Sequence, residues 1–165
     1  MLVGVISDTH GNQSAVAKAL RLLASRKVEC IIHCGDIDDV ATLHMFAGTK
    51  LHLVFGNCDP PTLQLDEIAH ALGLQFHGRL GQLELGGARI AFMHGDDRHR
   101  LDYLVRSGAY DFVFHGHTHQ RRCVQVGATW VVNPGALARV AVPTIALVDL
   151  PSQQVEFLDV PAPSG

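Results

Sequence analysis

The chain has 165 residues, of which 47% are hydrophobic and 18% are charged, and its formal net charge at pH 7 is −3. Since this length can bury one sizeable hydrophobic core, we expect a single domain that spans residues 1–165. The small negative charge, without a run of Lys or Arg, argues against a protein that binds long nucleic acid or an anionic membrane surface.

The first half of the chain alternates between strand patterns and helix patterns. Runs of β-branched and other apolar residues predict strands at residues 2–7, 28–33 and 51–55. A helical pattern follows each strand, over residues 16–24, 40–46 and 63–72. We expect Asn12 or Ser14 to cap the first helix and Asp38 to cap the second, because such side chains accept hydrogen bonds from free N–H groups.

The second half is richer in strands. These are predicted at residues 80–85, 89–93, 112–114, 124–126, 129–132, 145–150 and 155–158, with one helix around 101–105 and a frayed tail at 161–165. A βαβαβα order followed mostly by strands predicts an α/β fold. Two mixed sheets stacked face to face, with helices outside both, satisfy this order as a four-layer α/β/β/α sandwich.

Two features of the composition indicate where the protein works. No apolar stretch approaches the roughly 18 residues of a membrane span, and the apolar run at residues 2–6 has no basic region before it. The cysteines Cys30, Cys34, Cys58 and Cys123 are scattered, without the C-x-x-C spacing of a structural zinc site. We therefore expect a cytoplasmic protein with reduced thiols and no membrane partner.

Five of the predicted strands end in Gly or Ser followed by side chains that can bind a metal ion. These side chains are Asp8 with His10, Asp36, Asn57, His94, and His117 with His119. Asp or Asn at one strand end is ordinarily a turn former. Together they are informative, because the carboxyl ends of strands in an open α/β sheet form the crevice where ligands bind.

The kinds of ligand in this set indicate the kind of metal. Carboxylate, imidazole and amide oxygen together suit Mn²⁺, Fe²⁺, Zn²⁺ or Ni²⁺, and no thiolate is required. Seven candidate ligands exceed what one ion needs. With one carboxylate as a bridge, they fit two ions about 3.5–4 Å apart, a spacing that clamps a phosphoryl group and activates water.

The motifs around these residues resemble one known family. D-T-H at 8–10, G-D-I-D-D at 35–39, G-N-C-D at 56–59, H-G-D at 94–96 and G-H-T-H at 116–119 follow one another as in the calcineurin-like metallophosphoesterase superfamily. In length, and in G-N-C-D, the chain is most similar to the small prokaryotic phosphodiesterase branch. The retromer scaffold subunit of eukaryotes shares the fold of that branch. The resemblance covers residues 2 to about 135 and implies the α/β/β/α sandwich.

The resemblance also implies roles for the residues. One ion would be held by Asp8, His10, Asp36 and His119, and the second by Asp36, Asn57, His94 and His117. The implied activity is that of a metal-dependent phosphoesterase, more specifically a phosphodiesterase that cleaves small phosphodiesters with a hydroxide bridging the ions. We expect manganese in first place, with nickel, iron or zinc as alternatives. The residues expected to take part in catalysis are Asp36, Asn57, Cys58 and His94.

Cys58 departs from the larger superfamily, in which many members have His after the G-N pair. That His is thought to assist phosphate binding or protonation of the leaving group. A thiol with a pKa near ~8.5 is a weaker partner for phosphate at neutral pH, so we expect modest turnover and a preference for good leaving groups. A covalent nucleophile at Cys58 is an alternative, but metal-activated water makes it unnecessary.

Other polar residues have structural interpretations. Asp39 is either a support for a ligand or a helix cap, and Asp59 is a turn former or a similar support. His33 and His115 are expected in the core, and Asn133 in a turn of the N-P-G type. An exposed surface position is expected for most Arg residues. Phosphate-facing charge near the rim remains an alternative for Arg98, Arg100, Arg121 and Arg122.

Two other functions fit the same fold. A scaffold protein that uses the surface for partners would show decayed ligand positions, whereas all seven are intact here. A nuclease acting on long nucleic acid would need a basic stripe, which the sequence lacks. The expected partner is therefore a small phosphodiester substrate, and a sheet edge near the C-terminus could pair to form a homo-oligomer.

Overall fold

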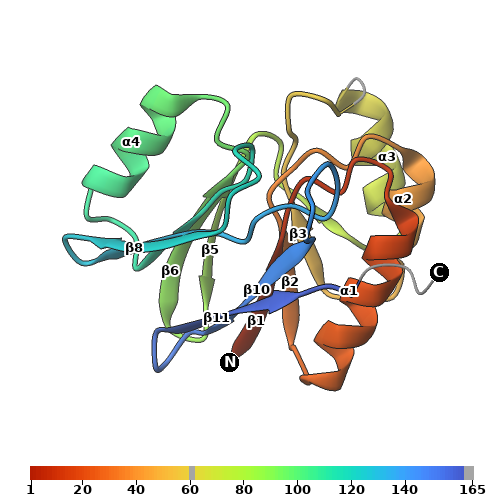
Figure 1. Cartoon of the computed structure of the whole chain (residues 1–165). Coiled ribbons are helices and arrows are strands. Elements are labelled where there is room, and N and C mark those ends of the chain that lie inside the picture. Colours follow the sequence, from red (N-terminus) through yellow and green to blue (C-terminus); the bar gives the residue numbers. More distant parts are fainter. Residues whose placement is uncertain (60–61, 162–165) are drawn as a thin grey trace.

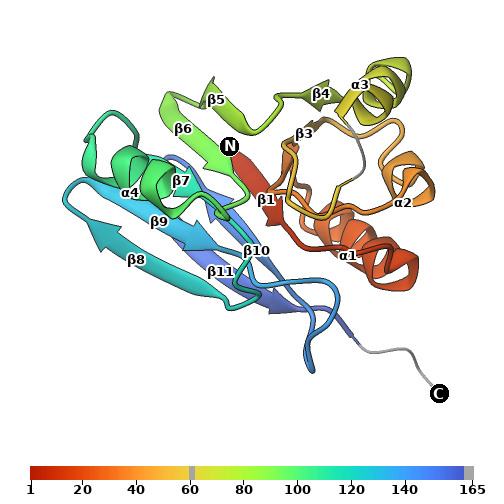
Figure 2. The same cartoon turned by 90° about the horizontal axis from the view of Figure 1, so that it is seen from above.

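The computed structural model of the chain describes residues 1–59 and 62–161 and contains two β-sheets with helices on their outer faces (Figure 1). Three helices, α1 (Gln13–Ser25), α2 (Val40–His44) and α3 (Thr62–Ala71), pack on one sheet. Helix α4 (Arg98–Arg106) packs on the other sheet, at the opposite side of the molecule (Figure 2). The four-layer α/β/β/α sandwich expected from the sequence is confirmed.

The first sheet has six strands in the order β11-β10-β1-β2-β3-β4. Their bounds are β1 (Leu2–Ile6), β2 (Cys30–His33), β3 (Leu51–Leu53), β4 (Gln75–Phe76), β10 (Thr144–Asp149) and β11 (Gln154–Asp159). Strands β1 to β4 run parallel, as the alternation of strand and helix predicts, while β10 and β11 extend the sheet antiparallel.

The second sheet has five strands in the order β5-β6-β7-β9-β8. Their bounds are β5 (Leu80–Leu85), β6 (Ala88–Met93), β7 (Phe112–Phe114), β8 (Arg122–Val126) and β9 (Thr129–Asn133). The three inner strands are parallel and each edge strand is antiparallel to its neighbour. Both sheets are therefore mixed, and several parallel strands in each end at the same edge of the sandwich.

The alternation of side chains along β1 shows how the layers are held together. Val3 and Val5 point between the two sheets, whereas Ile6 faces the helices. Gly4, on the same side as Ile6, lets α1 approach closely, because a Cβ there would lie 2.6 Å from a methyl carbon of Leu23. Burial on both faces makes this strand apolar throughout, and the polar residues follow only after it ends.

The structure also departs from the sequence-based expectations. Strand β4 was not predicted, because two residues give no detectable periodicity. Asp38 does not cap α2: that role belongs to Asp39, whose side chain accepts the N–H of Thr42 at 2.6 Å. Asn12 caps α1 as predicted, through the N–H of Ala15. The tail predicted at 161–165 lies, from residue 162 on, outside the described residues.

Among the residues that the structure describes, no helix has both the length and the apolar character needed to cross a membrane. The four cysteines are all free.

Candidate metal centre

The seven candidate ligands follow the carboxyl ends of β1, β2, β3, β6 and β7, and the fold brings them together at one edge of the sandwich. Most of them occupy unusual backbone conformations. A positive φ is found at Asp8 (53°), His10 (41°), Asp36 (59°), His117 (67°) and His119 (57°). Non-glycine residues rarely adopt this left-handed region, and such strain concentrates at functional sites. Among the described residues, five of the nine non-glycine positions with a positive φ are therefore candidate ligands.

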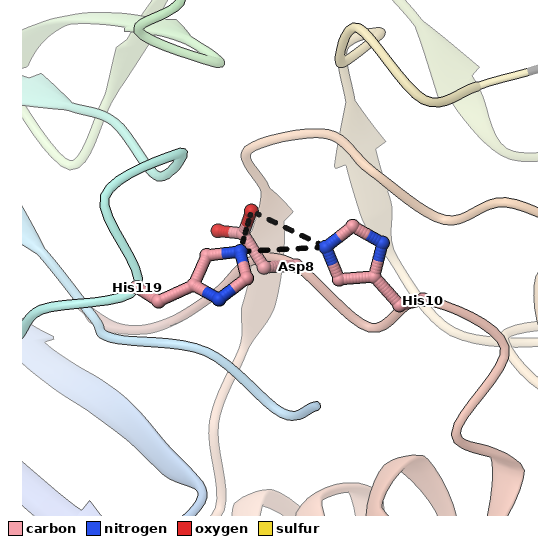
Figure 3. A group of neighbouring side chains, drawn as sticks. All are labelled: Asp8, His10 and His119. Atoms are coloured by element: carbon pink, nitrogen blue, oxygen red, sulfur yellow. Dashed lines mark hydrogen bonds and ion pairs between the residues drawn. The ribbon is translucent and has the colours of Figure 1, made fainter. Parts of the chain in front are cut away.

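One group of side chains is formed by Asp8, His10 and His119 (Figure 3). The Nε2 atom of His119 lies 3.2 Å from Oδ1 of Asp8 and 3.4 Å from Nε2 of His10. Oδ1 of Asp8 and Nε2 of His10 are 3.9 Å apart. Three potential ligand atoms thus point at one spot.

A second group is centred on His94. Its Nε2 atom lies 3.1 Å from Oδ1 of Asn57 and 3.3 Å from Nδ1 of His117. It is also 3.3 Å from Oδ2 of Asp36. The other ring nitrogen of His94, Nδ1, donates to the backbone carbonyl of Cys34 at 2.9 Å, and this fixes the ring so that Nε2 faces the group.

Asp36 belongs to both groups. Its Oδ2 atom lies 3.3 Å from Nε2 of His94 and 3.6 Å from Nε2 of His10. Oδ1 of the same carboxylate accepts the backbone N–H of Cys58 at 2.9 Å. Gly56 permits this position, since a Cβ there would lie 1.9 Å from Oδ1 of Asp36. One carboxylate oxygen therefore faces two sets of ligands, which is the arrangement of a bridging ligand.

The arrangement fits divalent metal ions. Oδ1 of Asp8 is buried and has no hydrogen-bond partner among the described residues, so it lacks the compensation that a buried oxygen needs. Facing ring nitrogens lie 3.3–3.4 Å apart in both groups. Two ligands about 2.0–2.1 Å from one tetrahedral ion are separated by about the same distance. A cation in each group would satisfy these atoms.

The charges of the cluster influence one another strongly. Burial raises the pKa of Asp8, and the Ser7 hydroxyl and the nearby histidines only partly offset this effect. Burial alone would also raise the pKa of Asp36, but hydrogen bonds from His94 and from the Cys58 N–H hold it below its usual range. The pKa of His94 is raised despite burial, because Asp36 stabilises its protonated form. Without a cation, protons must therefore take part in balancing the charge.

Several residues form hydrogen bonds that hold the candidate ligands in position. Asp59 accepts backbone N–H groups from residues 36–38 and 56, so it orders the turn that carries Asp36. Asp38 accepts from Nδ1 of His10 at 3.0 Å, which directs Nε2 of that ring toward the centre. Asp38 thus orients a candidate ligand, and Asp39 is the helix cap. Of the two roles open to Asp59, the structure favours support.

His33 and His115 lie in the core, as the sequence predicted. His33 is fully buried, with hydrogen bonds to the Thr9 hydroxyl and the Gly35 N–H, and burial lowers its pKa to about 3. His115 is buried too, and burial lowers its pKa to about 4. Asn133 donates to the carbonyl of Gly116 at 2.9 Å and so ties the N-P-G turn to the loop carrying His117 and His119.

Cys58 is exposed at the edge of the centre. The ligand atoms of His10, Asp36 and Cys58 all lie within 4.8 Å of one another. Slight burial, followed by the carboxylates of Asp36 and Asp38, raises the pKa of the thiol, so it stays protonated at neutral pH. A neutral thiol is a poor nucleophile, which argues against a covalent role.

Arg139 is a residue of this region that sequence reasoning missed. Its Nη2 donates to Oδ2 of Asp38 at 3.4 Å, and its guanidinium is close enough to Cys58 to act against the raised pKa of that thiol. One signal was present in the sequence: Arg139 is the single charged residue between positions 134 and 148. Arg98, Arg100, Arg121 and Arg122 are exposed, as expected, and Arg121 pairs with Asp159 at 3.2 Å.

Comparisons of the sequence show which known proteins this chain is similar to. The sequence profile of the calcineurin-like phosphoesterase superfamily domain matches residues 1–153. Phosphodiesterase MJ0936 of Methanocaldococcus jannaschii is 29% identical over 154 residues, which cover 90% of this chain and 93% of the relative.

Solved structures agree with this similarity. The structure of an archaeal phosphodiesterase has a TM-score of 0.91 at 27% identity, and the match covers 96% of this chain and 99% of that one. Vps29 of Entamoeba histolytica, in a structure with zinc, has a TM-score of 0.68 at 21% identity, with 98% and 100% covered. The second comparison shows a shared fold.

Proposed function

The chain belongs to the calcineurin-like phosphoesterase superfamily, and on this premise we propose that it is a phosphodiesterase using two divalent metal ions. The observation that carries the proposal is the position of Asp36, whose Oδ2 faces His10 on one side and His94 on the other. Similarity to MJ0936 and to the archaeal phosphodiesterase structure supports the choice of diesters as substrates.

Each ion would be held by four of the residues described above. We assign Asp8, His10, Asp36 and His119 to one ion, and Asp36, Asn57, His94 and His117 to the other. When bound, such a pair of ions supplies a nucleophile from water at neutral pH and neutralises charge on the phosphoryl oxygens. The mixture of oxygen and nitrogen ligands supports manganese, with nickel, iron or zinc as alternatives.

The protein's own cationic contribution to phosphate binding is assigned to Arg139. A phosphate at the centre would lie beside Cys58, which is a neutral hydrogen-bonding group there. Arg139 stands next to that thiol, and a planar guanidinium with several N–H groups suits phosphate oxygens better than a thiol does. Asp38 holds Arg139 on one side and leaves further N–H groups of the guanidinium for a substrate.

Four further properties complete the proposal. Residues 1–165 would form one domain, and the substrate would be a small phosphodiester rather than long nucleic acid. Four free cysteines are consistent with the reducing cytoplasm. Pairing through an edge strand, for which β11 is available, is our proposal for any homo-oligomer.

The test is hydrolysis of bis(p-nitrophenyl) phosphate by metal-stripped protein that is refilled with Mn²⁺, Ni²⁺, Zn²⁺ or Mg²⁺ in turn. We expect turnover that depends on the metal and is lost in His119→Ala and Asp36→Asn. Because Asp36 faces both groups, Asp36→Asn should reduce the number of tightly bound ions more than His119→Ala does. The number of ions bound to each variant can be measured separately by calorimetry.

Tight metal binding without turnover on diesters or monoesters would contradict the proposal. It would favour the alternative of a scaffold protein that retains the fold, and the next measurement would then be a search for protein partners.

A further inference from the structure

A hollow of about 320 Å³ opens directly beside the candidate metal centre. His119 lines it, so one imidazole belongs both to the centre and to the wall of the hollow. Another part of the wall is formed by residues 140–142, which follow Arg139 in the chain. A phosphate held at the centre would therefore have one of its ester groups within reach of this space.

The wall of the hollow that comes from residues 140–142 is apolar. It consists of Val140, Ala141 and Val142, and the side of Val142 toward solvent is uncovered, with 54% of the residue exposed. Among the described residues only two other large hydrophobic side chains, Tyr103 and Val126, are classed as exposed. An apolar ligand group that covers this exposed valine would remove apolar surface from water, which makes binding more favourable.

The polar groups of the hollow are already paired. Arg121 donates to Asp159 at 3.2 Å, so this pair adds no net charge to the wall. The hydroxyl of Thr144 donates to the carbonyl of Pro134 at 2.7 Å and is not available as a donor to a ligand. The hollow therefore combines an apolar wall with a neutral ion pair, and this combination favours an uncharged ester group over a second phosphate.

We propose that this hollow is the subsite for one ester group of the substrate, and that this group is uncharged and largely apolar, such as an aryl ring. The inference rests on the proposed function, because it requires the phosphate to lie at the centre beside His119. It names the substrate class more narrowly: a phosphodiester in which at least one alcohol is bulky and apolar.

The test compares the binding of two diesters that differ only in their ester groups. Diphenyl phosphate and dimethyl phosphate are titrated calorimetrically into the full-length, Mn²⁺-loaded protein. We expect diphenyl phosphate to bind at least about tenfold more tightly, since a ring in the hollow removes apolar surface from water. In the Zn²⁺-loaded protein, where the bound ion is diamagnetic and does not broaden nearby signals, methyl resonances of Val140 and Val142 should shift with diphenyl phosphate and not with dimethyl phosphate.

Val142→Asn is the variant that tests the wall, because Asn is similar in size, polar and uncharged. It should reduce the preference for diphenyl phosphate to less than about threefold. Val126→Asn is the matched control. This valine is 39% exposed and is the last residue of β8, whereas Arg121 of the hollow lies just before the first residue of that strand. The preference for diphenyl phosphate should stay at its original value in this variant. Folding of both variants can be checked by their unfolding curves.

The results separate the subsite from the proposed function. Equal binding of the two diesters, or an unchanged preference in Val142→Asn, would overturn the subsite while metal-dependent hydrolysis remains. Absence of hydrolysis with a preference that Val142→Asn removes would overturn the proposed function and leave the subsite standing.

Discussion

Asp59 holds the turn that carries Asp36: its Oδ2 accepts the backbone N–H of Asp36 at 3.0 Å. The same carboxylate accepts the N–H groups of Ile37, Asp38 and Gly56 at 2.6–2.9 Å. Four donors on one carboxylate stabilise the left-handed backbone conformation of Asp36, which has a φ of 59°. A residue that is not a candidate ligand thus fixes the carboxylate shared by both groups.

Asp59→Asn is therefore expected to weaken metal binding, although Asp59 is not assigned as a ligand. The amide NH₂ group cannot accept hydrogen bonds, so two of the four N–H groups lose their partner and the turn loosens. We expect the affinity for Mn²⁺ to fall about 10–100-fold, which is typical for the loss of a group that orients metal ligands. Calorimetric titration of metal-stripped protein measures this. Asp102→Asn, on the exposed face of α4, is the control, and equal affinities in the two variants would refute the prediction.

Asp38→Asn should also lower metal affinity, through His10. Loss of the negative charge weakens the bond to Nδ1 of His10, and the ring then points less firmly at the centre. We expect a smaller effect than for Asp59, about tenfold. The neighbouring Asp39→Asn is a matched control, since Asn is also a good N-cap and should leave both α2 and metal binding intact. If both variants bound metal equally well, the role assigned to Asp38 would be wrong.

The contrast between Asp38 and Asp39 shows a feature that the sequence alone could not predict. A helix cap needs an extended backbone, which Asp39 has with a φ of −141°, whereas Asp38 has a φ of 72°. Adjacent acidic residues do not reveal which of them has which conformation. The turn is set by the four hydrogen bonds to Asp59, twenty-one residues away from Asp38 in the chain. Whether Asp38 or Asp39 caps α2 therefore depends on a tertiary contact, which the local sequence does not reveal.

The fold and the composition of the centre were more accessible to sequence analysis. Each candidate ligand follows an apolar strand directly, so strand pattern and chemistry occur together in short segments such as D-T-H at 8–10. Parallel strands then bring their carboxyl ends to one edge. Arg139 and the hollow beside His119 have no such local signature. They depend on the path of the 136–143 segment across the centre, which is set by tertiary packing.

Cys58→His should improve the hydrolysis of diesters with poor leaving groups. The thiol of Cys58 remains neutral, and it lies beside the phosphate position assigned above. An imidazole there can bind a phosphate oxygen or protonate the leaving alkoxide. We expect kcat to rise about tenfold with methyl phenyl phosphate and to change much less with methyl p-nitrophenyl phosphate. Equal changes for both substrates would show that leaving-group protonation is not what the thiol lacks.

Arg139→Gln supplies the complementary test. If the guanidinium binds the phosphate, KM for both of these diesters and the inhibition constant of inorganic phosphate should rise several-fold together. Arg139→Lys should recover part of the affinity, because it keeps the charge but loses the planar pair of donors. An effect confined to kcat, with unchanged phosphate inhibition, would assign Arg139 to a role through Asp38 instead.

Acid sensitivity is expected from a pair of histidines, His52 and His77, that are not candidate metal ligands. Nδ1 of His52 lies 3.0 Å from Nε2 of His77, and the rings are stacked. Burial, then the charges of His77 and Lys50, lower the pKa of His52 to about 4, and burial lowers the pKa of His77 as well. The unfolded chain, with His pKa near 6.5, binds more protons between pH 6.5 and about 4, so the free energy of unfolding falls as pH falls through this window.

His52→Leu removes one of these groups and should make the free energy of unfolding less dependent on pH. Nε2 of His52 is buried without a hydrogen-bond partner among the described residues, so an apolar replacement loses little there. Urea unfolding at pH 5 and pH 7.5 measures the difference in stability, which should shrink in His52→Leu. His70→Leu, at an exposed position of α3, should keep the original difference. Because burial also depresses the pKa values of His33 and His115, part of the acid sensitivity will remain in every variant.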